Sequence, residues 1–172
     1  MFKFIIIAFT LLTTTAVSIY TLSVPAISTG AINFQNYQGK KILLVNIATS
    51  GSNLEQLTEL EQFYQLHKDS VVVIGFPSNS FGNTTQTNTG IKQFLDSYGI
   101  TFPIAAKSDV DDVNANTVYK WLANAADNGS HEVEITEDFQ KVLIGKTGKI
   151  KGVFSAALHL QSQFISNALR AN

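Results

Sequence analysis

Four serines are the side chains best suited to nucleophilic chemistry, and they fall in two short loops. Ser50 and Ser52 flank Gly51 after one apolar run, and Ser78 and Ser80 follow a second one. A serine hydrolase needs a histidine that takes the proton from its serine hydroxyl. None of these serines has a histidine near it in the sequence. Helix capping and loop hydrogen bonding are therefore the simpler roles for them.

The types and spacing of the possible metal ligands do not indicate a metal site. His67, His131 and His159 share no short spacing of the kind that binds a metal ion. The segment 109–114, DVDDVN, resembles a calcium loop, but it lacks the glycine and the distal glutamate that such loops use. We expect isolated histidines, an acidic helix-capping turn, and no metal or cofactor site.

Cysteine is absent from all 172 residues. Disulfides, thiolate metal ligands and cysteine nucleophiles are thereby removed together. The loop 48–52 is nevertheless where a reactive cysteine would be favoured, because a strand leads into it and a helix is expected to follow. The N-terminus of a helix lowers the pKa of a nearby thiol. Gly51 stands at this place in the chain.

Two buried strands are expected to position these loops. Ile42–Val45 and 70–76 are continuous apolar runs, which are typical of parallel strands covered on both faces. The motif SNLE at 52–55 matches a capping box and predicts a helix from there to about His67. The polar stretch 77–88 has no regular period and predicts a long loop at the same edge of the sheet.

The remaining patterns complete an α/β order of elements. Ser18–Val24 has the composition of a strand, and a turn before Ala31–Phe34 indicates an N-terminal β-hairpin. Phe139–Ile144 and Ile150–Ser155 predict a second antiparallel hairpin around the turn KTGK. This order predicts a thioredoxin-like α/β fold with a central mixed β-sheet flanked by helices.

Three further helices are expected to cover this sheet. One spans 90–98, and a second has its inner face from Val118 to Ala125 and ends at 128–129. The last is expected at 158–170, with an inner face made of Leu160, Phe164, Ala168 and Leu169.

The N-terminus is expected to direct export. No charge appears between Lys3 and Lys40, and residues 4–24 are strongly apolar. Their length suits a membrane anchor. The basic start, the short core and the small residues at 13–18 suit a secretory signal, and the threonines that dilute the apolar run favour it. We expect a signal peptide at 1–17, cleaved near 16–18, or else an anchor. Either one leaves the domain 18–172 exported, periplasmic or secreted.

The composition suits one globular domain, with 45% hydrophobic residues and a net charge of −1. This charge gives no sign of a nucleic-acid or membrane-surface partner, and no basic patch appears along the sequence. Contact with a membrane is expected only if the N-terminal segment stays uncleaved.

Motifs spread over residues 18–170 resemble the glutathione peroxidase family. They are SIY at 18–20, YQGK at 37–40, LVNIA at 44–48, GFPSNSFG at 75–82, YGITFP at 98–103, DV at 109–110, YKWL at 119–122 and KVLIGKTGK at 141–149. The resemblance implies a thioredoxin-like fold. For active family members it also implies peroxide reduction at a cysteine or selenocysteine that is supported by Gln, Trp and Asn.

At the positions that correspond to these catalytic residues, this chain has residues of other types. The nucleophile falls on Gly51, the glutamine on Ser80, and the Trp–Asn pair on Glu137 and Asp138. Leu95 stands where many thiol-dependent members have a resolving cysteine. A cysteine at position 51 is expected to be activated by the helix N-terminus. The two carboxylates either oppose a thiolate in the old pocket or are solvated loop residues.

The lost positions imply an exported, catalytically inactive family member that serves as a binding or interaction module for an unknown protein or small molecule. The alternative is a peroxidase-class enzyme of the oxidative-stress response that works through an unrecognised metal or cofactor. A third reading is a scaffold with no site. Tyr98-Gly99 runs directly into Ile100, without the loop that tetrameric family members use at their interface, so a monomer or weak dimer is expected.

Overall fold

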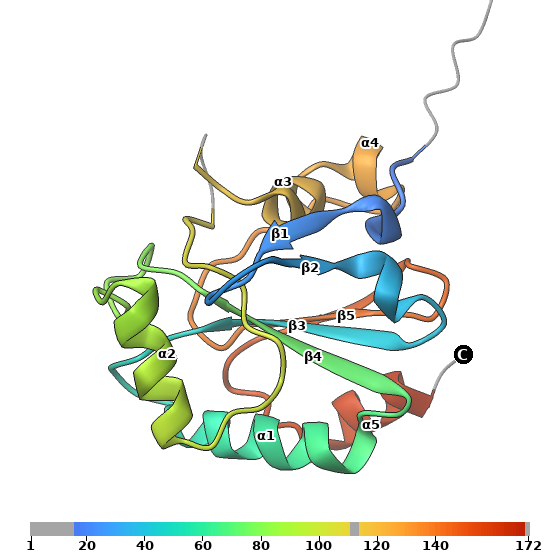
Figure 1. The fold of residues 1–172 in the computed structure, drawn as a ribbon. Coiled ribbons are helices and arrows are strands. Elements are labelled where there is room, and N and C mark those ends of the chain that lie inside the picture. The colour runs from blue at the N-terminus through green and yellow to red at the C-terminus, as the bar shows by residue number, and fades with distance from the viewer. Residues whose placement is uncertain (1–15, 111–113, 171–172) are drawn as a thin grey trace, which may run out of the picture.

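A mixed four-stranded β-sheet forms the centre of the computed structural model, which describes residues 16–110 and 114–170 (Figure 1). Strand β3 (Lys41–Ile47) runs parallel to β4 (Val71–Pro77) and antiparallel to β5 (Lys141–Ile144). Strand β6 (Ile150–Phe154) pairs antiparallel with β5 and completes the order β4–β3–β5–β6. The sheet predicted from the apolar runs is thereby confirmed.

Both faces of this sheet are covered, which explains why its strands are apolar throughout. In β3, Ile42 and Leu44 belong to one core, whereas Leu43, Val45 and Ile47 belong to the other. The elements that cover the first face are the hairpin of β1 (Ser23–Pro25) and β2 (Ala31–Asn33) and the helix α3 (Thr117–Ala123) with the short α4 (Ala125–Asn128). Those on the second face are α1 (Glu55–His67), α2 (Asn88–Ser97) and α5 (Gln163–Arg170) (Figure 1).

The N-terminal hairpin is present, but the strand expected from Ser18 was wrong at its start. Residues Ile19–Thr21 form a 3₁₀ turn, η1, and the hydroxyl of Ser18 accepts a hydrogen bond of 3.3 Å from the backbone of Tyr20. Short polar side chains compete with strand pairing in this way. After β2 the chain makes a second 3₁₀ turn, η2 (Phe34–Tyr37).

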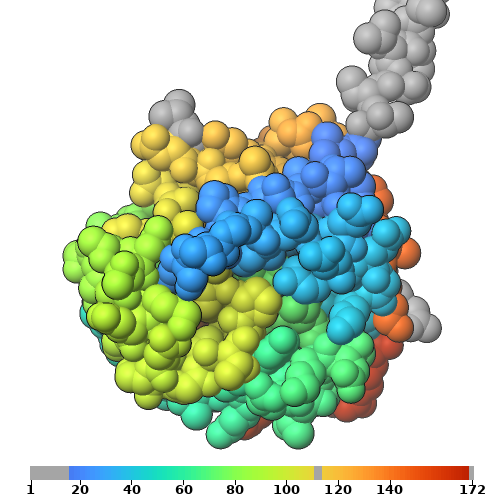
Figure 2. Space-filling model, viewed as in Figure 1, coloured from blue at the N-terminus to red at the C-terminus, as the bar shows by residue number. Residues whose placement is uncertain are grey.

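The hairpin is fastened to the edge of the main sheet by the segment 104–106. The amide of Ile27 donates to the carbonyl of Ile104 at 2.9 Å, and Ile104 in turn bridges to Gly75 of β4. Figure 2 shows the hairpin residues in blue, lying across this face of the molecule beside the yellow segment that follows α2.

Helix α1 begins later than the capping-box motif predicts. Its first residue is Glu55, and its N-cap, Leu54, makes no side-chain capping bond. Asn53 has a φ of +70°, a left-handed conformation that turns the chain before the helix starts. The expected end at His67 is confirmed.

The last helix is also shorter than expected, and the prediction that Phe164 belongs to its buried face was wrong. It starts at Gln163 because residues 155–162 are held in turns, in which Leu158 donates to Ser155 and Ser162 donates to His159. Phe164 is 72% exposed, and the fully buried residue of this helix is Ile165.

The helix expected after Val118 is divided in two. Asn124 adopts an extended backbone that ends α3, and its side chain caps α4 by accepting from Ala126. Gly129, with a φ of +66°, ends α4 at the place that was predicted. The acidic turn expected at 109–114 includes residues 111–113, which lie outside the described part of the chain.

Within the residues that the structure describes, no helix is long and apolar enough to cross a membrane. The signal peptide or anchor expected at 1–17 falls almost wholly on residues 1–15, which lie outside that part.

Candidate functional site

The loops that follow β3 and β4 meet at one edge of the sheet, because these two strands are parallel and end side by side at Ile47 and Pro77. The backbone amides of Thr49 and Ser50 both donate to the carbonyl of Asn83, at 3.1 Å each. The first loop is thus closed over the second, as the sequence predicts for the carboxyl edge of an α/β sheet.

Gly51 lies on the exposed rim of this edge with a φ of +88°. A β-carbon placed on Gly51 would lie 3.2 Å from both Cγ and Oδ1 of Asn83. Such a contact is tighter than ordinary van der Waals packing, and side chains rarely adopt this backbone conformation. The amide of Asn83 therefore occupies the space that a side chain at position 51 would enter.

Asp138 holds that amide in place. The Nδ2 of Asn83 donates to one carboxylate oxygen of Asp138 at 2.8 Å, and the Nδ2 of Asn46 donates to the other at 3.1 Å. Asn46, on β3, is only 2% exposed, and its Oδ1 accepts a 2.9 Å hydrogen bond from the buried hydroxyl of Tyr119. A continuous chain of hydrogen bonds thus runs from α3 through the sheet to the space beside Gly51.

Burial sets the electrostatics of this hydrogen-bonded chain, which we call the Asn46–Asp138 network. Desolvation raises the pKa of Asp138, and the hydrogen bonds from Asn83 and Asn46 partly counter it. Desolvation also raises the pKa of Tyr119 well above its ordinary value, with a smaller contribution from the charge of Asp138. Tyr119 is therefore a neutral hydrogen-bond donor at physiological pH.

Ser78 and Ser80 form a separate unit on the second loop. Ser78 is fully buried, and its hydroxyl donates to that of Ser80 at 3.0 Å. The Ser80 hydroxyl accepts from the backbone of Val110, at 3.1 Å. Both serines thus make hydrogen bonds within the loop, which is the role that the sequence favoured. They bond to one another and not to the residues of the Asn46–Asp138 network.

Glu137 and Asp138 are neighbours in sequence but face different partners. Oε1 of Glu137 accepts a 2.8 Å hydrogen bond from the backbone of Ala156, in the segment after β6. Both side chains are half-buried, so neither is a freely solvated loop residue. Of the four degenerate positions, Gly51 and Asp138 are brought together through Asn83, whereas Ser80 and Glu137 are engaged elsewhere.

A buried lysine lies under this edge of the sheet. Nζ of Lys141 donates to Oε1 of Gln56 at 2.7 Å and to the carbonyl of Phe139 at 2.9 Å. Desolvation lowers its pKa to about 8, against the opposing effects of Glu59 and Glu137. Both partners of the ammonium are neutral oxygens of the fold, which makes Lys141 a structural link between α1 and β5.

None of the three histidines makes a hydrogen bond to Ser50, Ser52, Ser78 or Ser80 in the described part of the chain. His67 packs against the ring of Phe63, His131 contacts the hydroxyl of Ser130, and His159 pairs with Glu59. Over the described ranges, no group of three or more His, Asp or Glu side chains is arranged to hold a metal ion.

Sequence reasoning did not single out Asn46, Asn83 or Tyr119 as site residues. Asn46 left a signal, since it is an amide within a buried apolar strand, where an unpaired polar group is costly. Asn83 lies in a polar loop without periodicity and gave none. Leu95, at the expected position of a resolving cysteine, is a core residue of α2.

The comparisons with known proteins agree with this architecture. The family model described as "Glutathione peroxidase" matches residues 19–123. The chain is 36% identical over 140 residues to glutathione peroxidase-like peroxiredoxin GPX5 of Chlamydomonas reinhardtii, covering 80% of this chain and 86% of that protein. It is also 36% identical over 126 residues to the peroxiredoxin HYR1 of Saccharomyces cerevisiae, covering 72% of this chain and 77% of that one.

Solved structures support the same conclusion. The apo crystal structure of Trgpx is similar with a TM-score of 0.65 and 30% sequence identity, over 90% of this chain and 97% of that one. T. cruzi GPX1 shares the fold with a TM-score of 0.66 at 22% identity, over 88% of this chain and 96% of that one. This chain therefore belongs to the glutathione peroxidase family, and it does so without a cysteine.

Proposed function

We propose that this chain is an exported, catalytically inactive member of the glutathione peroxidase family that serves as a binding or interaction module. The proposal rests on what occupies the nucleophile position at Gly51 and the space beside it. No sulfur nucleophile exists in the chain, and the amide of Asn83, held by Asp138, fills the adjoining space. A serine hydroxyl does not replace a thiolate in peroxide chemistry, because it is not ionised near neutral pH and has no accessible sulfenic state.

The retained fold supports a role in binding. The loops at the edge keep a closed set of backbone and side-chain hydrogen bonds, which gives a fixed surface although the nucleophile is gone. A polar hollow of about 390 Å³ adjoins the second loop and is lined by Asn79, Lys107, Ser108, Asp109 and Asn114. Ligand sites are concave and use a small number of polar groups to fix the orientation of a ligand, and this hollow offers such groups.

The binding role is tested by capture of partners from the exported fraction of the source cells. Ser50→Arg with Ser80→Arg crowds the rim of the edge, and both serines are exposed. Ser97→Arg with Ser130→Arg adds the same charge elsewhere on the surface. We expect the unmodified chain and the second variant to retain the same partners, and the first variant to lose them. Equal capture by all three would contradict a binding site at this edge.

Export predicts a defined N-terminus for the mature protein. The indole of Trp121 donates to the carbonyl of Val17 at 2.8 Å, and the backbone nitrogen of Val17 donates to the backbone carbonyl of Asp127 at 2.7 Å. Ile19, two residues later, is fully buried. Cleavage after Ala16 preserves these contacts and satisfies the small-residue rule. N-terminal sequencing of the exported protein should therefore begin at Val17. Recovery of intact Met1 in a membrane pellet would favour the anchor instead.

A further inference from the structure

Basic side chains that are distant in sequence converge at the edge of the sheet opposite Gly51. The register of β3 and β5 pairs Ile42 with Ile144, so the turn between β5 and β6 lies beside the start of β3. This places the exposed Lys146, Lys149 and Lys151 next to Lys41. Burial lowers the pKa of Lys41, and the charges of Lys146 and Lys151 lower it further.

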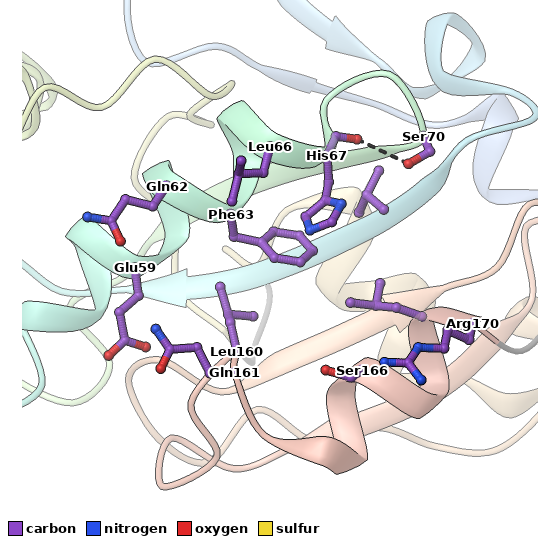
Figure 3. Close-up of a pocket in the computed structure, with 12 residues that line it drawn as sticks. Glu59, Gln62, Phe63, Leu66, His67, Ser70, Leu160, Gln161, Ser166 and Arg170 are labelled. Carbon is purple, nitrogen blue, oxygen red and sulfur yellow. Dashed lines mark hydrogen bonds between the residues drawn. The ribbon is translucent and has the colours of Figure 1, made fainter.

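The ends of two helices bring further cations to the same edge. Nζ of Lys41 donates to the carbonyl of Leu169 near the end of α5, and Nζ of Lys40 donates to that of Lys68 after α1. A groove of about 470 Å³ between these helices is lined at one end by His67, Ser70 and Arg170 (Figure 3). We call Lys40, Lys68, Lys146, Lys149, Lys151 and Arg170 the basic pole.

Some carboxylates also lie near the basic pole. Asp69 follows Lys68 in the sequence, the carbonyl of Asp127 accepts from Val17, and Glu59 lines the other end of the groove that Arg170 lines (Figure 3). Glu137 and Asp138 lie at the far end of the sheet, where β3 ends and β5 begins. The net charge of −1 is compatible with a local excess of cations at this edge. The linear sequence does not show this grouping, because its cations come from segments that are far apart along the chain.

The N-terminal segment leaves the folded part of the chain beside this pole. A β-carbon placed on Gly129 would lie 2.8 Å from Cβ of Ala16 and 2.9 Å from Nζ of Lys149. The sequence before Ala16 is uncharged and apolar back to Phe4, and Lys3 precedes it. The apolar sequence is thus joined to the described part of the chain at Ala16, close to Lys149. An apolar segment next to a cluster of cations is the combination that an anionic bilayer surface favours.

We propose that the basic pole docks on an anionic lipid surface, with its lysines facing the phosphate headgroups and the edge at Gly51 facing away. Each Lys or Arg near such a surface contributes about a fivefold gain in affinity at physiological salt. A nucleic acid would attract the same charges, but the chain before cleavage also has an apolar segment joined to the domain at Ala16, next to Lys149, and this favours a membrane. The inference is independent of whether the opposite edge has any activity.

The first test measures how the full chain partitions onto vesicles. Phosphatidylcholine vesicles with and without phosphatidylglycerol are compared, and the ratio of the two partition coefficients removes the contribution of the apolar segment. Lys146→Gln with Lys149→Gln is expected to reduce this ratio by roughly 25-fold. Lys92→Gln with Lys120→Gln changes the net charge equally on other surfaces and is expected to change the ratio less than about threefold. Unchanged melting temperatures check that both variants fold.

The second test reads orientation, and the lack of cysteine in the chain makes it simple. Thr147→Cys at the pole and Thr85→Cys at the opposite edge, both exposed, each carry one polarity-sensitive fluorophore. Anionic vesicles are expected to shift the emission of the dye at 147 and not that at 85. Equal shifts, equal loss of binding in both lysine variants, or tighter binding to a DNA duplex than to the vesicles at the same ionic strength would overturn the proposal.

Discussion

Gly51→Cys is expected to give this chain a thiol that reacts only slowly with hydrogen peroxide, and Asp138→Asn in the same chain is expected to speed the reaction about tenfold at pH 7. The new side chain must adopt a φ near +88° and displace the amide of Asn83. The ionised carboxylate of Asp138, which binds that amide, opposes the thiolate and raises the pKa of the thiol by about one unit.

The helix N-terminus gives less help than the sequence suggested. Because α1 begins at Glu55 and not at Ser52, its free amides do not lie directly beside position 51. The activation expected from the capping-box motif is therefore reduced, and the local carboxylate is the stronger influence on the thiol.

Asp138→Asn removes the negative charge while the hydrogen bonds of the Asn46–Asp138 network can still form. The Oδ1 of an asparagine at 138 still accepts from Asn46, and its Nδ2 donates to Oδ1 of Asn83 once that amide turns over. The measurement is the rate of thiol alkylation against pH, followed by stopped-flow reaction with peroxide. Thr147→Cys, with and without Asp138→Asn, is the matched control and should show no difference. An identical thiol pKa in the two Gly51→Cys chains would contradict the assigned role of Asp138.

Asn46→Ala is expected to lower the free energy of unfolding by about 3 kcal/mol, because it leaves several buried groups without partners. The Tyr119 hydroxyl loses its acceptor, and Asp138 and the carbonyl of Glu137 lose a donor. Tyr119→Phe breaks only the first of these bonds and is expected to cost about 1–2 kcal/mol.

Urea unfolding followed by the fluorescence of Trp121, the one tryptophan of the chain, measures these values. Asn36→Ala removes an exposed amide and should change stability by less than about 0.5 kcal/mol. If Asn46→Ala lowers the free energy of unfolding by no more than Asn36→Ala does, the Asn46–Asp138 network does not stabilise the fold.

The strands were predictable from the sequence because their signal is local. Runs such as Ile42–Val45 are apolar on both faces, and in a chain of this composition a run of that length is typical of a strand at the centre of a covered sheet. Helix starts were less predictable, since they depend on backbone conformations that composition does not encode. Because Asn53 has a positive φ and turns precede Gln163, α1 and α5 both start later than the sequence predicts. In α5, Phe164 is therefore exposed to solvent.

The candidate site was only partly predictable for a different reason. Gly51 and Asp138 were identified as degenerate positions from the resemblance, but what joins them is Asn83, from a loop with no recognisable period. A hydrogen-bonded network assembled from three distant segments leaves no pattern in any one of them. The basic pole was not predictable either, because its residues meet only through strand register and the ends of two helices.

The most direct test of the central claim is a peroxide-consumption assay on the unmodified, metal-free protein. Hydrogen peroxide and an organic hydroperoxide are each supplied with thioredoxin or glutathione, and NADPH oxidation is followed through the matching reductase. With Gly51 at the nucleophile position and no cysteine in the chain, we expect no turnover above the buffer rate. Donor-dependent turnover that rises in proportion to the concentration of this protein would contradict the account.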